Sequence, residues 1–227
     1  MSKSIEKQLN DTANKKLGKL NYIVSPAAFL SVILLTVLLT GCGPFYGLFI
    51  APLIPKKKIM AEHEMQEKNV LIWVEISAAT EHSPILRREL TLKMKEELAI
   101  NEAVGQVVDY DRLVQFRHRN PRLAELSIKE LGEKFQAQEV LYILINKYKL
   151  KHEAGEGYCR AAGGGYVKVI DVATGRRLWP TGQNHRFFHV DEGVTMGTGQ
   201  QFENEQVRKL CESIAKKIVP FFYEHKK

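Results

Sequence analysis

The sequence predicts an α/β fold of the α+β type, in which a mixed sheet is flanked by helices in the order β-α-β-α-β-β-β-α. Two patterns carry this prediction. Residues 70–74 read Val-Leu-Ile-Trp-Val, an uninterrupted apolar run typical of a strand buried on both faces. Farther along, Leu86, Leu90, Met94 and Leu98 recur every fourth residue, which predicts an amphipathic helix over 84–100.

The elements before residue 140 follow from local signals. Ser83 is a candidate N-cap, with Pro84 at the first helical position. Residues 104–108 are a candidate second strand, and a short helix is expected over 111–117. Ser127-Ile128-Lys129-Glu130 matches a capping box and predicts a short helix that ends near Phe135.

The second half of the chain alternates strands with glycine-rich stretches. Strands are expected over 139–150 and 166–172, and the latter forms a hairpin with 176–179 through the turn at 173–175. We expect Gly163-Gly164-Gly165 to be a flexible entrance to this hairpin. A further strand is expected over 185–190, and a loose loop at Gly193, Gly197 and Gly199. An apolar stripe then predicts a C-terminal helix: Val207, Leu210, Cys211, Ile214, Ile218 and Phe221.

The composition is that of an ordinary folded protein. The chain has 227 residues, of which 44% are hydrophobic and 26% charged, with a formal net charge of +7. The expected organisation is a signal segment over 1–41, a tether over 42–69 and one α/β domain over 70–227. The part after residue 41 has a net charge of about +4, which indicates a mixed, solvated surface; an anionic surface such as lipid headgroups is the alternative partner.

The N-terminal segment has the order of an export signal. Basic residues precede an apolar stretch over 27–39, and small residues follow it. The end of this stretch, Leu39-Thr40-Gly41-Cys42, resembles the lipobox of bacterial lipoproteins. The resemblance implies cleavage before Cys42, which would then carry lipid on its sulfur and on its new amino group. It implies a protein attached to a membrane of the cell envelope.

An uncleaved anchor is the alternative reading of the same segment. The region before the apolar stretch is long and contains Glu6 and Asp11, and apolar residues resume over 44–55. A single membrane span over about 22–41 would then join the domain to the membrane. Lysines flank this span on both sides, so its orientation is poorly decided.

Residues near Cys42 bear on where the protein would reside. Gly43 follows the cysteine, where an Asp would be the inner-membrane retention signal in some enteric bacteria, so the periplasmic face of the outer membrane is favoured. Three prolines interrupt the first part of the tether, and Lys56-Lys57-Lys58 is placed to contact anionic headgroups.

The domain also resembles a known family. Its elements follow one another in a characteristic order. A buried first strand is followed by a long helix, a strand that ends in Asp109 and the short helix at 126–135. The hairpin with Asp171-Val172-Ala173-Thr174-Gly175-Arg176 comes after them. This order is similar to the α/β module of envelope lipoproteins, among them the curli-secretion lipoprotein, the activator of penicillin-binding proteins and the N-terminal domain of the Tol propeller protein. The resemblance implies a non-catalytic binding or assembly module.

No residue set predicts a reaction, a metal site or a cofactor. Gly163-Gly164-Gly165 lacks the Gly-Lys-Ser/Thr of a phosphate loop, and no Gly-x-Ser-x-Gly elbow occurs. His185 and His189 would lie roughly 13 Å apart on a strand, too far to share one ion. Cys159 beside Arg160 is a weak nucleophile candidate. We therefore expect no enzyme, with a membrane-tethered enzyme as the alternative, and leave open whether Cys159 pairs with Cys211.

One charged cluster is a candidate contact surface. Basic residues gather around Pro121: Arg112, Arg117, His118, Arg119 and Arg122. They would suit an anionic partner, such as lipid, a cell-wall polymer or an acidic envelope protein. A solvated helix-loop face is the competing interpretation, because acidic residues lie nearby in sequence. Nucleic acid is not expected, since an exported domain would not meet it.

Overall fold

The computed structural model describes residues 58–80, 84–152 and 157–226. The chain divides into two units, Met1–Lys56 and Lys57–Lys227, and all described residues belong to the second. The signal segment, Cys42 and most of the expected tether therefore lie outside the described residues. No described helix is long and apolar enough to cross a membrane.

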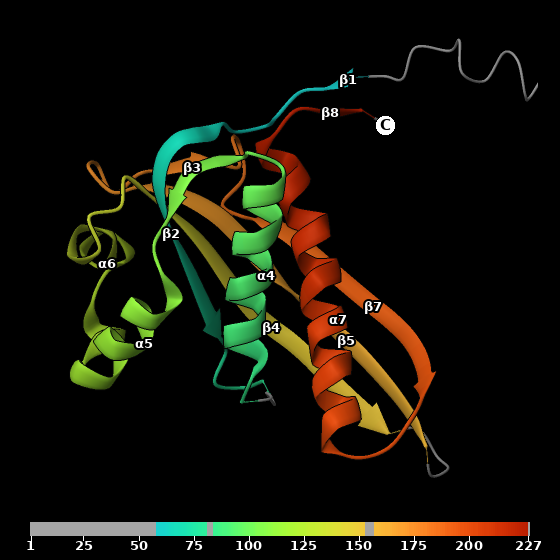
Figure 1. Ribbon diagram of the computed structural model, residues 1–227. Coiled ribbons are helices and arrows are strands. Elements are labelled where there is room, and N and C mark those ends of the chain that lie inside the picture. Colours follow the sequence, from blue (N-terminus) through green and yellow to red (C-terminus); the bar gives the residue numbers. More distant parts are fainter. Residues whose placement is uncertain (1–57, 81–83, 153–156, 227) are drawn as a thin grey trace, which may run out of the picture. The chain divides into compact units, whose positions relative to one another are not determined.

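A mixed six-stranded sheet forms the centre of the second unit, which confirms the predicted fold class (Figure 1). The strand order is β3-β2-β4-β5-β6, and β7 also pairs with β5. β2 runs parallel to both β3 and β4, whereas β5 is antiparallel to β4, β6 and β7. The bounds are Met65–Ile76 for β2, Val104–Val107 for β3, Glu139–His152 for β4, Tyr158–Asp171 for β5, Arg177–Trp179 for β6 and Arg186–Met196 for β7.

Helices cover the two faces of this sheet unequally. The long helices α4 (Leu86–Ile100) and α7 (Gln200–Ile218) lie side by side on one face (Figure 1). Two short helices, α5 (Tyr110–Arg119) and α6 (Ile128–Lys134), pack on the opposite face near β2 and the start of β4. A 3-10 turn at Leu123–Glu125 joins them, and another at Val219–Phe222 follows α7.

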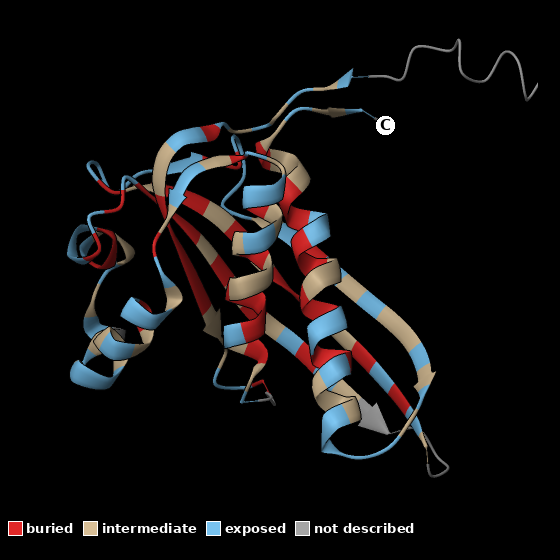
Figure 2. Cartoon of the chain, viewed as in Figure 1, coloured by how far each residue is buried: buried red, intermediate tan, exposed pale blue. Residues whose placement is uncertain are grey.

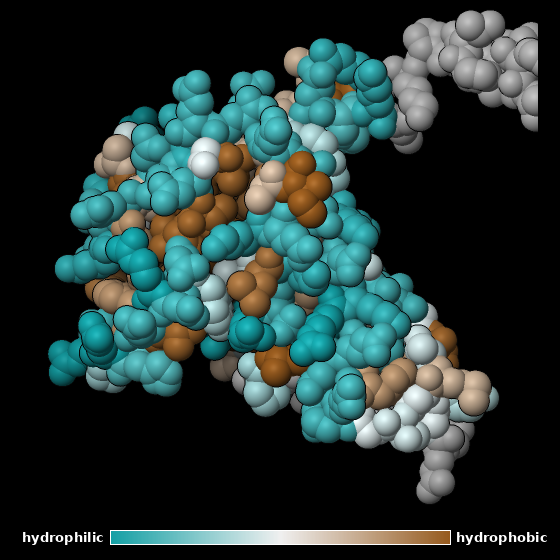
Figure 3. All heavy atoms as spheres, viewed as in Figure 1, coloured by the Kyte–Doolittle hydropathy of each residue, from teal (hydrophilic) through white to brown (hydrophobic). Residues whose placement is uncertain are grey.

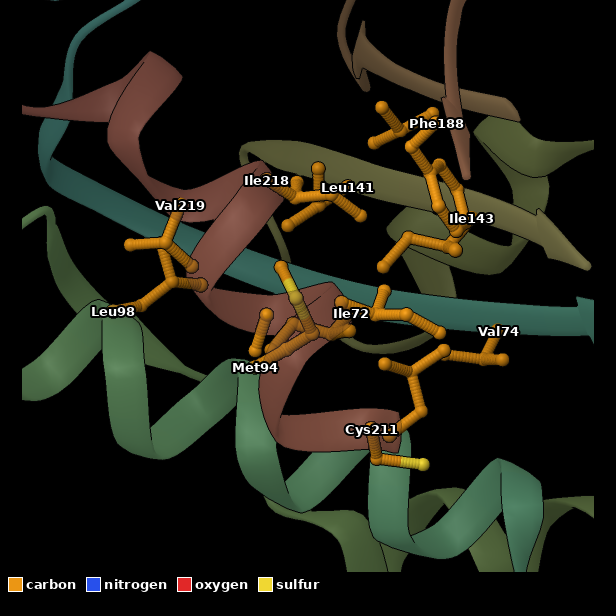
Figure 4. Packing of buried hydrophobic residues seen from close by; sticks show 14 of the residues in the cluster. Ile72, Val74, Met94, Leu98, Leu141, Ile143, Phe188, Cys211, Ile218 and Val219 are labelled. Atoms are coloured by element: carbon orange, nitrogen blue, oxygen red, sulfur yellow. The ribbon is translucent and has the colours of Figure 1, made fainter. Parts of the chain in front are cut away.

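The larger core lies between the sheet and the two long helices. Met94 and Leu98 of α4 and Cys211 and Ile218 of α7 belong to one buried cluster with strand residues such as Ile72 and Ile143 (Figure 4). Figure 2 shows buried residues along the sides of both helices that face the sheet. Figure 3 shows the outer side of the same helices as largely hydrophilic, as the amphipathic patterns predict.

A smaller core lies under the short helices. Leu71 and Trp73 of β2 are buried there together with Leu113 of α5 and Leu131 of α6. Because alternate residues of β2 point to opposite faces, the apolar run at 70–74 fills both cores at once. This is why the run is uninterrupted, and the prediction of a strand buried on both faces is confirmed.

Several local predictions can be compared with the observed helix ends. The capping box is confirmed, with the Ser127 hydroxyl accepting from the Glu130 amide and the Glu130 carboxylate accepting from the Ser127 amide. α4 begins at Leu86, two residues later than predicted, and Ile85 occupies its N-cap position. Ser83, the predicted N-cap, lies outside the described residues.

The segment before β2 is bound to residues near the C-terminal end of the chain and to Trp179 of β6. Strand β1 (Lys58–Ile59) pairs with β8 (His225–Lys226) in a separate two-stranded sheet. The amides of Glu62 and His63 donate to the Phe221 carbonyl, and the Glu62 carboxylate accepts from Trp179 Nε1 at 3.0 Å. We call residues 58–64 the entry strap. β2 itself begins at Met65, ahead of the predicted apolar run.

The prediction of a flexible loop at Gly163-Gly164-Gly165 is wrong. These glycines lie inside β5 and pair with both β4 and β7. A Cβ atom at Gly163 would sit 3.3 Å from side-chain atoms of Leu210 and Ile214, so the missing side chain lets α7 pack closely on the strand. Glycine acts here through close approach and not through chain flexibility.

The predicted loop after residue 190 is also partly wrong. β7 continues to Met196, with a register irregularity where Arg160 and Ala162 of β5 face it. Gly193 takes a φ of +73° at this irregularity, where the strand carries an extra residue. Gly193 therefore marks a bulge inside β7 and does not end the strand.

Candidate functional site

The half of the sheet away from the short helices has one face that no described helix covers. Register and alternation place two cross-strand rows on this face. One row is Lys147 of β4, Gly164 of β5 and His189 of β7, and the next is Lys149, Ala162 and Asp191. In each row a long cationic side chain and a polar side chain stand on either side of a small residue.

These rows form a groove. Neighbouring strands lie about 4.8 Å apart, so side chains on β4 and β7 stand roughly 10 Å apart across the floor that β5 supplies. The groove has a volume of about 330 Å³. Its lining consists of Lys147, Tyr148, Lys149, Arg160, Ala162, Gly163, His189 and Asp191.

The carboxylate of Asp191, which lines the groove, is already engaged. Arg160 donates from Nε to Asp191 Oδ1 at 2.9 Å and from Nη2 to Oδ2, and the Gly193 amide donates to Oδ1 at 3.0 Å. These hydrogen bonds lower the pKa of Asp191 to about 2. Asp191 is therefore ionised across the physiological range, and its charge is balanced by Arg160.

The two lysines of the groove have no acidic partner among the described residues. Both are exposed, and within the described part of the chain neither makes a hydrogen bond or an ion pair. The described ion pairs of other lysines all lie elsewhere, for example Lys216 with Glu212 on α7. The groove thus presents uncompensated positive charge over a floor of small residues.

A network of aromatic and charged side chains lies on the same face of the sheet, separated from the groove by Leu144 and Tyr166. Glu75 accepts from Trp73 Nε1 at 3.0 Å and from the Tyr142 hydroxyl. Burial and the bond to Glu75 raise the pKa of Tyr142 above its usual range. The Lys168 ammonium lies 4.8 Å from the Tyr142 ring centroid, and burial lowers the pKa of Lys168. These hydrogen bonds satisfy the Glu75 carboxylate and hold Trp73 and Tyr142 in place on this face of the sheet.

The structure separates the arginines of the sequence-predicted anionic patch. Arg112, Arg119 and Arg122 are exposed on α5 and the turn after it. Arg117 instead turns inward, with its guanidinium 4.3 Å from the Trp73 ring centroid and Nη2 donating to the Val74 carbonyl at 3.1 Å. Burial lowers the pKa of Arg117 to about 10. Three of the four arginines therefore remain available to a partner on this surface.

The histidine and cysteine candidates lie apart from one another. No group of three or more His, Cys, Asp or Glu side chains in the described ranges is arranged to hold a metal ion. Cys159 and Cys211 are both buried and both free thiols. Burial raises the pKa of each, so neither is activated as a nucleophile.

Sequence reasoning did not find the groove. Lys147 and Lys149 were part of the expected strand over 139–150, where alternating lysines look like an ordinary solvated strand face. The residues on the other side of the groove, His189 and Asp191, come from β7, some forty residues later in the chain. Only the register of three strands brings the two sides together. The available signal was the Lys-x-Lys pattern opposite a run of small residues.

Comparison with known proteins gives structural similarities only. No protein-family model and no curated protein matches the chain. It is similar to a lipoprotein from Neisseria meningitidis, at 14% identity and a TM-score of 0.44 over 65% of this chain and 99% of that one. It is also similar to the PelC dodecamer from Paraburkholderia phytofirmans, at 13% identity and a TM-score of 0.42 over 74% of this chain and 96% of that one. For the LpoB C-terminal domain from Salmonella enterica the identity is 16% and the TM-score 0.34, over 62% and 91%.

Proposed function

We propose that this chain is a lipid-anchored protein of the cell envelope whose α/β domain binds a partner and does not catalyse a reaction. The observation that carries the binding role is the uncovered sheet face with its groove, where Lys147 and Lys149 present charge that nothing in the described chain neutralises. The buried thiols of Cys159 and Cys211, with raised pKa values, are poor nucleophiles and suit a binding role.

The proposed anchor is lipid on Cys42. The lipobox Leu39-Thr40-Gly41-Cys42 ends an apolar stretch of 13 residues, which is short for a membrane span of about 20. A single acyl chain holds a protein only marginally, so a multiply acylated cysteine is the physically adequate anchor. We place the domain on the periplasmic face of the outer membrane, where it would meet an envelope protein or the cell wall.

Replacing Cys42 by Ser is expected to abolish incorporation of labelled palmitate and to leave the precursor uncleaved. The reason is that both lipid attachment and cleavage before the cysteine require its thiol. The measurement is labelling of cells that express the parent or the variant, followed by gel electrophoresis and membrane fractionation. Absence of label in the parent chain, with no size difference from the variant, would sink the lipid anchor and favour an uncleaved span.

Counting thiols gives an independent prediction. In denaturant, a chain with lipidated Cys42 is expected to react with maleimide at two cysteines, and an unmodified chain at three. In the native state Cys159 and Cys211 should stay unlabelled, because both are buried. Intact-mass spectrometry of the purified full chain in detergent checks both counts. Three labelled thiols in denaturant would contradict lipidation.

A further inference from the structure

The groove repeats its positive charge at a fixed interval. Lys147 and Lys149 are two residues apart on β4 and point to the same face, so their Cα atoms lie about 7 Å apart along the strand. Alternate residues of an extended peptide have the same repeat. A peptide that runs along the groove would therefore place every second side chain opposite a lysine.

Exposed apolar side chains lie at both ends of the groove. Beyond one end, Leu144, Tyr166 and Phe187 form the next cross-strand row, and Phe187 is 52% exposed. At the other end, the row that follows Ala162 and Asp191 holds Arg160 and Val194, and Val194 is 49% exposed. Tyr158 and Met196, which is 71% exposed, form the row after that one. A ligand that fills the groove thus meets positive charge in the middle and apolar side chains on either side. A free inorganic anion would leave these apolar rows uncovered.

The position of the groove favours a protein ligand over membrane lipid. The entry strap, where the chain coming from the proposed anchor joins the domain, runs from the β1–β8 pair to the start of β2, at one end of the six-stranded sheet (Figure 1). Lys147 and Lys149 belong to the opposite half of β4, toward the hairpin with β5. The groove is therefore remote from the point at which the domain is attached.

We propose that the groove binds an extended acidic peptide segment of a partner protein, with two carboxylate side chains at alternate positions and an apolar residue beyond each. This inference rests on the proposed binding function and names the chemistry of its partner. One carboxylate would lie between Lys147 and His189, and the next beside Lys149. Asp191 does not repel the peptide, because Arg160 neutralises it.

The test uses the full chain in a nonionic detergent and fluorescein-labelled peptides. The probe is Leu-Ser-Glu-Ser-Glu-Ser-Leu, and the spacing control is Leu-Ser-Ser-Glu-Glu-Ser-Leu, which has the same composition. Fluorescence anisotropy should show that the probe binds at least about tenfold more tightly than the control. The Lys147→Glu/Lys149→Glu double variant should lose this binding, and it should instead bind a probe in which lysine replaces glutamate.

Matched variants separate this surface from the arginine cluster. The Arg112→Glu/Arg119→Glu variant carries the same change of charge on exposed residues of α5 and should bind the acidic probe as the parent does. The inference is overturned if this variant loses binding while the lysine variant keeps it, or if probe and spacing control bind equally. It is also overturned if only polyphosphate or phosphatidylglycerol vesicles bind. These outcomes leave the palmitate result for Cys42 untouched, so the anchor and the ligand are tested separately.

Discussion

Replacing Gly165 by Ala is expected to lower the free energy of unfolding by about 3 kcal/mol. A Cβ atom at this position would sit 1.9 Å from the Leu144 carbonyl oxygen and 3.1 Å from Ile145 Cα. Both contacts are with backbone atoms, which cannot move away by changing rotamer as the end of a side chain can. The pairing of β4 with β5 beside the bulge between Ile145 and Lys147 would have to shift. Urea unfolding of the full chain in detergent, followed by circular dichroism, measures the loss.

Gly163→Ala is the matched control, two residues earlier on the same face of β5. Its Cβ atom would meet only the ends of the Leu210 and Ile214 side chains, at 3.3 Å. The expected change is under about 1 kcal/mol, because alanine also restricts the unfolded chain. Equal losses for the two variants would show that helix packing, and not the approach of β4, requires glycine here.

Replacing Trp179 by Ala is expected to cost about 4 kcal/mol, the second large effect. The indole is 1% exposed and packs against Phe221 and Phe222, with ring centroids 5.3 and 5.2 Å away. Its Nε1 also donates to Glu62 of the entry strap. The variant should therefore lose core packing and release the strap. Urea unfolding measures the first effect, and amide hydrogen exchange at residues 62–63 measures the second.

Leu178→Ala provides the control for this variant. Leu178 is the neighbour of Trp179 on β6 and is 37% exposed, so its truncation should cost under about 1 kcal/mol and leave exchange in the strap unchanged. Trp179→Phe should keep most of the packing but lose the bond to Glu62. Unchanged exchange in Trp179→Phe would contradict a role for this hydrogen bond in holding the strap.

Most of the fold could be predicted because its signals are local. The apolar run at 70–74, the four-residue repeat from Leu86 to Leu98 and the Ser127–Glu130 capping box each depend on neighbours in sequence, and each is confirmed. The prediction of a flexible segment at Gly163-Gly164-Gly165 is wrong because glycine has two structural roles. It loosens a chain, but it also permits close approach, and only the positions of Leu144 and α7 show which applies.

The entry strap and the groove could not be predicted for a related reason. Glu62 and His63 look like polar tether residues, yet they bond to Trp179, Phe221 and Glu139, which follow much later in the chain. Lys147 and His189 meet only through the pairings of β5 with two different strands. The register between strands that are far apart in the chain produces no hydrophobic periodicity that could be recognised in a single sequence.

The pairing of β1 with β8 determines how the domain would respond to tension. Because the two strands are antiparallel neighbours, the start of β1 at Lys58 lies beside the end of β8 at Lys226. A pull on the N-terminal side would reach this short ladder first. It would load the two residue pairs together in shear, because β8 joins the fold at the end of the ladder opposite to the pull. The load would next reach the Glu62–Trp179 bond and only then β2, which is held between two parallel neighbours along its length. The entry strap would thus detach under load before the six-stranded sheet that carries the groove unfolds.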